Sequence, residues 1–266
     1  MSTPPFDTLE RPKAEGEKAA RARLPSGPVT VEGKFLAVGG ERFWIRAITY
    51  GSFKANEEGE PFPPYPKLKE DFAQMAAAGI NTVRLYTAPT VRIADAAAEA
   101  GLMLIPEIGW APRFCELGTD REQYIYQWAE EKVRELAGHP AILMYSIGNE
   151  MPPLMVRWYG VDRVSQFLRK MCSIVKENTN GALVTYVNHP PTEYLNLPQF
   201  DVVSFNIYLE KEETFRKYLA RLHSLAGDRP VFLAELGLDS VEHGHEAQAD
   251  FMRRFIRATF EKGLCG

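Results

Sequence analysis

The sequence of 266 residues is poor in cysteine, and it lacks both a long apolar run and an excess of positive charge. Its three cysteines, Cys115, Cys172 and Cys265, are an odd number without metal-ligand spacing, which predicts neither a disulfide framework nor a metal site. No apolar stretch approaches the roughly 20 residues of a membrane helix. The formal net charge of -4 provides no basic surface for phosphate backbones. We therefore expect no membrane partner, no nucleic acid partner and no metal.

The first 28 residues have few large apolar side chains, and they lack periodicity and the apolar core of a secretory signal. They predict a disordered tail and a cytoplasmic protein. Residues 29–42 contain two short apolar runs broken by glycines, which is typical of a small hairpin. We expect this hairpin to cap the bottom of a single domain, residues 29–266, whose length suits one α/β barrel.

From residue 43 onward, short apolar runs alternate with longer helical patterns, and this alternation predicts a parallel sheet built from βα units. The expected strands are 43–50, 80–86, 102–108, 141–147, 182–187, 202–208 and 231–234. The expected helices are 67–78, 92–100, 122–137, 161–177, 212–225 and 246–261. The segment 190–200 is too short and too rich in proline for a full helix.

A doubly wound open sheet would favour a glycine-rich phosphate loop after the first strand, and Tyr50-Gly-Ser-Phe-Lys54 has no such pattern. The α/β class is therefore assigned to a (β/α)8 TIM barrel. Residues 264–266 fall where an eighth strand should begin, so we expect that strand to be truncated, with both edges of the sheet left open and one wall of the site missing.

Catalytic residues of such barrels lie at the carboxyl ends of strands. The polar and aromatic residues at these positions are Arg84, Tyr86, Glu107, Trp110, Asn149, Glu150, Asn188, His189, Asn206, Tyr208 and Glu235. Side-chain alternation predicts that Ser204, Asn206 and Tyr208 face inward. The same rule puts Val231, Leu233 and Glu235 on one face, so Glu235 stands at the mouth if the other two fill the barrel.

Glu150 and Glu235 would share this mouth although they lie far apart in the sequence. An acid for the leaving oxygen and a nucleophile for the anomeric carbon are the minimum equipment for cleaving a glycosidic bond. The pair therefore predicts a glycosidase whose partner is a carbohydrate and which uses no cofactor.

Three segments resemble clan A retaining glycoside hydrolases, especially family 2. His139-Pro-Ala-Ile-Leu-Met-Tyr-Ser-Ile-Gly-Asn-Glu150 is similar to the clan's fourth strand, Phe232-Leu-Ala-Glu-Leu-Gly237 to its seventh, and Asn81-Thr-Val-Arg-Leu-Tyr86 to its second. Leu104-Ile-Pro-Glu-Ile108 resembles the third strand of family 2, with Pro106 where aspartate is usual.

This resemblance implies a retaining β-glycosidase that works through a covalent glycosyl-enzyme. Glu150 would be the general acid/base, Asn149 the donor to the sugar 2-hydroxyl and Glu235 the nucleophile. Arg84 and Tyr208 would keep Glu235 ionised and oriented.

Several assignments have alternatives. Asn206, His189, Trp110 and Glu107 are expected to bind substrate, but His189 could belong to a solvated loop, Trp110 could serve packing, and Glu107 could be an ordinary surface residue. A transglycosylase on the same site and a non-catalytic carbohydrate-binding barrel are the alternative functions. The sugar, the linkage, endo or exo action and the oligomeric state are not predicted.

Overall fold

The computed structural model describes residues 24–109, 117, 118 and 120–266, and its centre is a run of seven parallel strands. The strands are β4 (Ala47–Tyr50), β5 (Thr82–Leu85), β6 (Met103–Pro106), β7 (Tyr145–Asn149), β8 (Val184–Asn188), β9 (Val202–Asn206) and β10 (Val231–Glu235). Each one pairs with the next in chain order, with β6 and β7 joined by two isolated bridges. The predicted α/β class with a parallel sheet is therefore confirmed.

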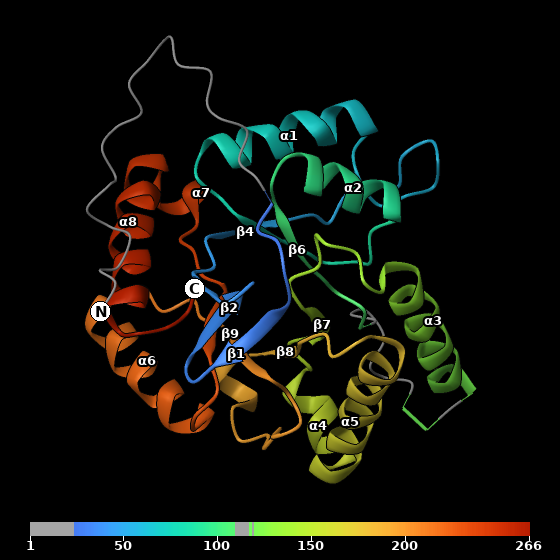
Figure 1. Cartoon of the computed structure of the whole chain (residues 1–266). Helices are drawn as coiled ribbons and strands as arrows, with labels where there is room; N and C mark the ends of the chain where they lie inside the picture. The colour runs from blue at the N-terminus through green and yellow to red at the C-terminus, as the bar shows by residue number, and fades with distance from the viewer. Residues whose placement is uncertain (1–23, 110–116, 119) are drawn as a thin grey trace.

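Helices surround these strands on the outside (Figure 1). They are α1 (Tyr65–Ala77), α2 (Val91–Glu99), α3 (Asp120–Leu136), α4 (Pro153–Tyr159), α5 (Val161–Asn178), α6 (Glu212–Ala226), α7 (Ser240–His243) and α8 (His245–Glu261). In α5, Val164, Phe167, Leu168, Met171 and Val175 are buried, a spacing of three and four residues that directs one face toward the sheet.

A small antiparallel sheet lies across the amino-terminal ends of the strands. It contains β1 (Val29–Glu32), β2 (Phe35–Val38) and β3 (Glu41–Phe43). Leu36 and Val38 share one buried cluster with Met103, Ile105 and Leu143 of the central strands and their approaches. Of the residues expected to form a tail, 1–23 lie outside the described part, whereas Leu24 packs against this cluster.

The sheet is curved so that its two ends approach each other. Cys265 donates its backbone N–H to the carbonyl of Val231 in β10 and accepts a hydrogen bond from Ile45, just before β4. Among the described residues, β4 and β10 are nevertheless the outermost strands. A groove of about 650 Å³ lies between them, lined by apolar residues that include Ile48, Leu233 and Phe260.

Two short helices were not expected from the sequence. Pro152 and Pro153 precede the body of α4, and proline suits the first turn of a helix, where its missing N–H is not needed. The four-residue α7 begins where Asp239 accepts a hydrogen bond from the N–H of Val241.

Between β8 and β9 the structure has only a 3-10 turn, Pro190–Thr192, in agreement with the prediction of no full helix there. No described helix combines the length and the apolar character needed to cross a membrane.

Gly109, which follows β6, provides a test of how closely the strand ends pack. A Cβ added at Gly109 would lie 2.4 Å from the carbonyl oxygen of Ile147, in the neighbouring strand. We expect Gly109→Ala to lower the free energy of unfolding by about 1–3 kcal/mol because the backbone must shift. Gly237→Ala is the matched control, since its Cβ would meet only the ring of Tyr208, at an ordinary 3.8 Å. Equal melting temperatures of the two variants would contradict this account of the packing.

Candidate active site

Glu235 ends β10 and receives hydrogen bonds from three side chains. Tyr86 and Arg84 donate to its Oε1 at 2.8 and 2.6 Å, and Tyr208 donates to its Oε2 at 2.7 Å. Burial alone would raise the pKa of Glu235, but the donors and the charge of Arg84 hold that pKa below its ordinary value. The carboxyl group is therefore ionised at neutral pH and fixed in orientation.

The two phenols remain donors throughout the neutral range. Burial, followed by the hydrogen bond to Glu235, raises the pKa of Tyr86 to about 12. The same causes raise the pKa of Tyr208, although 60% of this residue is exposed. The hydrogen bond from Tyr86 was not expected from the sequence. It could have been found, because Tyr86 lies two residues after Arg84 and alternation therefore puts both on one face.

Arg84 connects three strand ends from a position that is only 1% exposed. Its Nη1 donates to Glu235, its Nη2 donates to Asn149 Oδ1 at 2.8 Å, and Glu107 lies 3.6 Å from Nη2. The guanidinium also lies over the ring of Tyr86, 4.6 Å from its centroid. Arg84 thus contacts the carboxyl group that the family resemblance assigns to it, and its orienting role stays a prediction.

The second carboxyl group, that of Glu150, is connected to Glu235 through two amides and the guanidinium of Arg84. Asn206 Nδ2 donates to Glu150 Oε1 at 2.8 Å and to Asn149 Oδ1 at 3.1 Å, and Asn149 is in turn held by Arg84. Glu150 has a left-handed backbone, with φ at 47°, a conformation that costs a residue with a Cβ about 1–3 kcal/mol. Residues from β5, β7, β9 and β10 thus meet in one network.

Irregular strand pairing turns both glutamates toward this network. The register between β9 and β10 shifts between Leu233 and Glu235, and that between β7 and β8 shifts between Ser146 and Asn149. Such irregularities change the direction of side chains next to active sites. The condition under which alternation would put Glu235 at the mouth, that Val231 and Leu233 fill the barrel, is not met, because both pack in the cluster formed with α6 and α8. Glu235 reaches the interior through the register shift.

Glu107 lies below the network and is fully buried. Burial raises the pKa of its carboxyl group to about 8, although Arg84 and a hydrogen bond from Ser146 act in the opposite direction. The alternative of a surface residue is therefore wrong. A direct contact with substrate is also excluded in this arrangement, since the side chain has no exposed area. Glu107 instead lies beside Arg84, with its Oε2 3.6 Å from Nη2 of the guanidinium.

Asn188 and His189, two further predicted residues, make their side-chain hydrogen bonds with Thr192. His189 follows β8, its Nδ1 lies 3.0 Å from Thr192 Oγ1, and burial lowers the pKa of its imidazole while the charge of Glu150 raises it. Asn188 also binds Thr192, which shapes the loop. Trp110 lies outside the described residues.

Solved structures of similar fold come from enzymes that act on sugars. A β-glucuronidase from Bacteroides uniformis matches with a TM-score of 0.75 and 17% identity over 91% of this chain and 32% of that one. A family 2 β-galacturonidase from Eisenbergiella tayi matches with a TM-score of 0.69 and 17% identity, over 87% of this chain and 44% of that one.

A curated relative has a different printed activity. The 1,3-β-glucanosyltransferase gel1 of Aspergillus fumigatus is 28% identical over 138 residues, which are 49% of this chain and 30% of the relative. The chain therefore matches less than a third of the length of this relative.

The family model described as the TIM barrel domain of glycosyl hydrolases family 2 matches residues 29–260. This match covers most of the chain and includes all the strands that carry the network of carboxylates and amides. The chain belongs to glycosyl hydrolase family 2 through its TIM barrel domain.

Proposed function

We propose that the protein is a retaining β-glycosidase in which Glu235 is the nucleophile and Glu150 is the general acid/base. Glu235 attacks the anomeric carbon while Glu150 gives its proton to the leaving oxygen, which yields a glycosyl ester and a free alcohol. Glu150 then removes a proton from water, the water oxygen attacks the anomeric carbon, and the ester bond to Glu235 breaks. The sugar leaves with its original anomeric configuration.

The observation that carries this proposal is the set of three donors on Glu235. A nucleophilic carboxylate must be ionised and must be held in place, and Arg84, Tyr86 and Tyr208 serve both needs. Glu150 contacts the amide of Asn206 and carries no ion pair with Arg84, so the two carboxyl groups have different surroundings. Different surroundings suit the two carboxyl groups to the different roles that the mechanism gives them.

The amide of Asn149 suits contact with the sugar. Its Oδ1 accepts hydrogen bonds from Arg84 and Asn206, which orients the Nδ2 group as a donor. We assign this donor to the 2-hydroxyl of the sugar in the reacting position. A retaining mechanism further requires the two carboxyl groups to lie about 5 to 5.5 Å apart in the working enzyme.

Transglycosylation is a second candidate, and the similarity to 1,3-β-glucanosyltransferase gel1 favours it. In this reaction a sugar hydroxyl replaces water in the second step, and the same two glutamates serve. Product analysis with laminari-oligosaccharides, with and without added acceptor, distinguishes the two: new, longer chains indicate transfer, whereas shortened chains alone indicate hydrolysis.

Chemical rescue tests the roles of the two glutamates. Glu235→Ala should abolish turnover of 4-nitrophenyl β-glycosides and of substrates with poor leaving groups alike, because no nucleophile remains. Glu150→Ala should lower turnover about 100-fold to 10,000-fold for poor leaving groups and much less for 4-nitrophenol, which needs no proton. Azide should restore both variants, giving the α-glycosyl azide with Glu235→Ala and the β-glycosyl azide with Glu150→Ala. The same anomer from both would contradict the assignment.

Tyr208 provides a test based on pH. Glu235 acts as an anion, so kcat/KM must fall as the pH drops through the pKa of this group. Tyr208→Phe removes a donor that lowers the pKa, and the acidic limb of the kcat/KM profile should therefore move to higher pH. Tyr194→Phe removes a hydroxyl from an exposed residue and should leave the profile in place. An unmoved limb in Tyr208→Phe would show that the phenol does not tune Glu235.

Arg84→Lys keeps the charge but loses the planar fork that reaches both Glu235 and Asn149. Losing one charge-assisted hydrogen bond of about 1.5–3 kcal/mol should lower kcat/KM about 10-fold to 100-fold. The matched control is Arg92→Lys, at an exposed ion pair with Glu58, which should change little. Equal kinetics for the two variants would contradict the role given to Arg84.

A further inference from the structure

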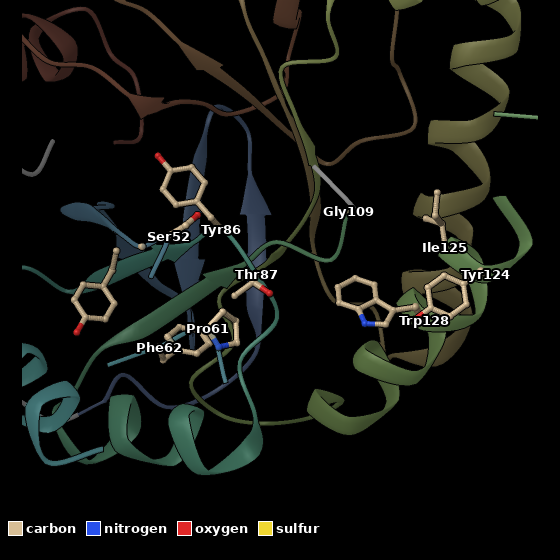
Figure 2. A pocket seen from close by; sticks show the side chains of 11 residues that line it. Ser52, Pro61, Phe62, Tyr86, Thr87, Gly109, Tyr124, Ile125 and Trp128 are labelled. Atoms are coloured by element: carbon tan, nitrogen blue, oxygen red, sulfur yellow. The ribbon is translucent and has the colours of Figure 1, made fainter. Parts of the chain in front are cut away.

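A pocket of about 390 Å³ adjoins the proposed catalytic centre and takes no part in the mechanism described so far. Most of its wall is aromatic or aliphatic. The lining consists of Tyr50, Gly51, Ser52, Pro61, Phe62, Tyr86, Thr87, Gly109, Tyr124, Ile125 and Trp128. Figure 2 shows Trp128 projecting from α3 toward Pro61 and Thr87 on the opposite wall.

The pocket is continuous with the catalytic centre through Tyr86. The same side chain lines the pocket and donates its hydroxyl hydrogen to Glu235. Gly109, another lining residue, packs against the carbonyl of Ile147 close to the end of β7. A ligand that fills the pocket would therefore lie against a side chain that also contacts Glu235.

The position of the pocket indicates which side of the reacting bond it serves. The leaving group must lie next to Glu150, which gives it a proton, and Glu150 is held by Asn206 of β9. The pocket is built instead from residues at the ends of β4, β5 and β6 and from α3. It thus lies on the Tyr86 side of Glu235, where the non-reducing part of a chain continues.

We propose that this pocket is a second sugar subsite, which binds the unit preceding the reacting sugar on the non-reducing side of a neutral β-glycan. This inference rests on the proposed glycosidase function and adds the substrate class: an oligosaccharide or longer chain, cleaved with more than one unit on the glycone side.

The chemistry of the walls fits a pyranose ring. The faces of sugar rings carry C–H groups that pack on aromatic side chains, and tyrosine and tryptophan add a polar group at the edge. Trp128 is only partly buried, so its indole has area left for a ligand. The hydroxyls of Ser52 and Thr87 add polar groups to the lining. None of the described lining residues is charged, which favours a neutral sugar over a uronic acid.

Aryl glycosides of different length test the proposal. The substrates are 4-nitrophenyl β-glucoside and 4-nitrophenyl β-laminaribioside, and the readout is the ratio of kcat/KM for the disaccharide to that for the monosaccharide. We expect a ratio of at least ten in the unmodified chain, with laminaribiose and nitrophenol as products. Trp128→Ala should bring the ratio near one, and Trp128→Phe should retain part of it. Trp158→Ala removes an exposed indole from α4 and should keep the full ratio.

A ratio near one in the unmodified chain, or an unchanged ratio in Trp128→Ala, would overturn the subsite. Release of 4-nitrophenyl glucoside in place of nitrophenol would also overturn it, because the second sugar would then occupy the leaving-group side.

Calorimetry with glucose, laminaribiose and laminaritetraose on Glu150→Gln separates binding from turnover. The subsite is supported if affinity increases from glucose to laminaribiose and falls at least tenfold with Trp128→Ala. This holds even if no glycoside is hydrolysed, because absence of hydrolysis would refute only the proposed function. Affinity independent of chain length overturns the subsite.

Discussion

The arrangement of the site depends on one buried guanidinium. Arg84 is almost completely removed from water, and a charge in that position is tolerable only when it is paired and hydrogen-bonded. Its partners come from three different strands: Glu107 after β6, Asn149 at the end of β7 and Glu235 at the end of β10. The requirement to satisfy this cation therefore draws together the groups that the proposed chemistry needs. It also links the geometry of the site to the curvature of the sheet.

The two glutamates differ because their neighbours differ. Glu235 faces a cation and two phenols, whereas Glu150 faces a neutral amide and lies on a strained backbone. Charge and hydrogen bonding stabilise an anion at Glu235, whereas Glu150 accepts a hydrogen bond from the amide of Asn206. The amides of Asn149 and Asn206 connect the two groups without adding charge. A single network thus keeps two identical side chains in different chemical conditions.

Much of the fold could be predicted from the sequence, because apolar runs of period two alternate with patterns of period 3.6. The strand ends, and with them Arg84, Asn206 and Tyr208, followed from that alternation. The inward direction of Glu235 did not follow from it, because a register shift after Leu233 breaks the regular alternation, and a shift depends on pairing with β9. The complete burial of Glu107 could not be predicted either, because it depends on how the neighbouring strands pack around this side chain. The helix α4 was not predicted, because its seven residues are too few to show a clear helical period.

Glu107 has a consequence for the balance of charge during the proposed reaction. The negative charge of Glu235 is one of the causes that raise the pKa of Glu107 to about 8, while Arg84 opposes them. When Glu235 forms an ester with the sugar, its charge disappears, and Arg84 then acts on Glu107 alone. Loss of that charge removes one cause of the raised pKa of Glu107. Glu107 is then the carboxyl group that remains beside Arg84, 3.6 Å from Nη2, so the buried guanidinium keeps a carboxyl neighbour while the sugar occupies Glu235.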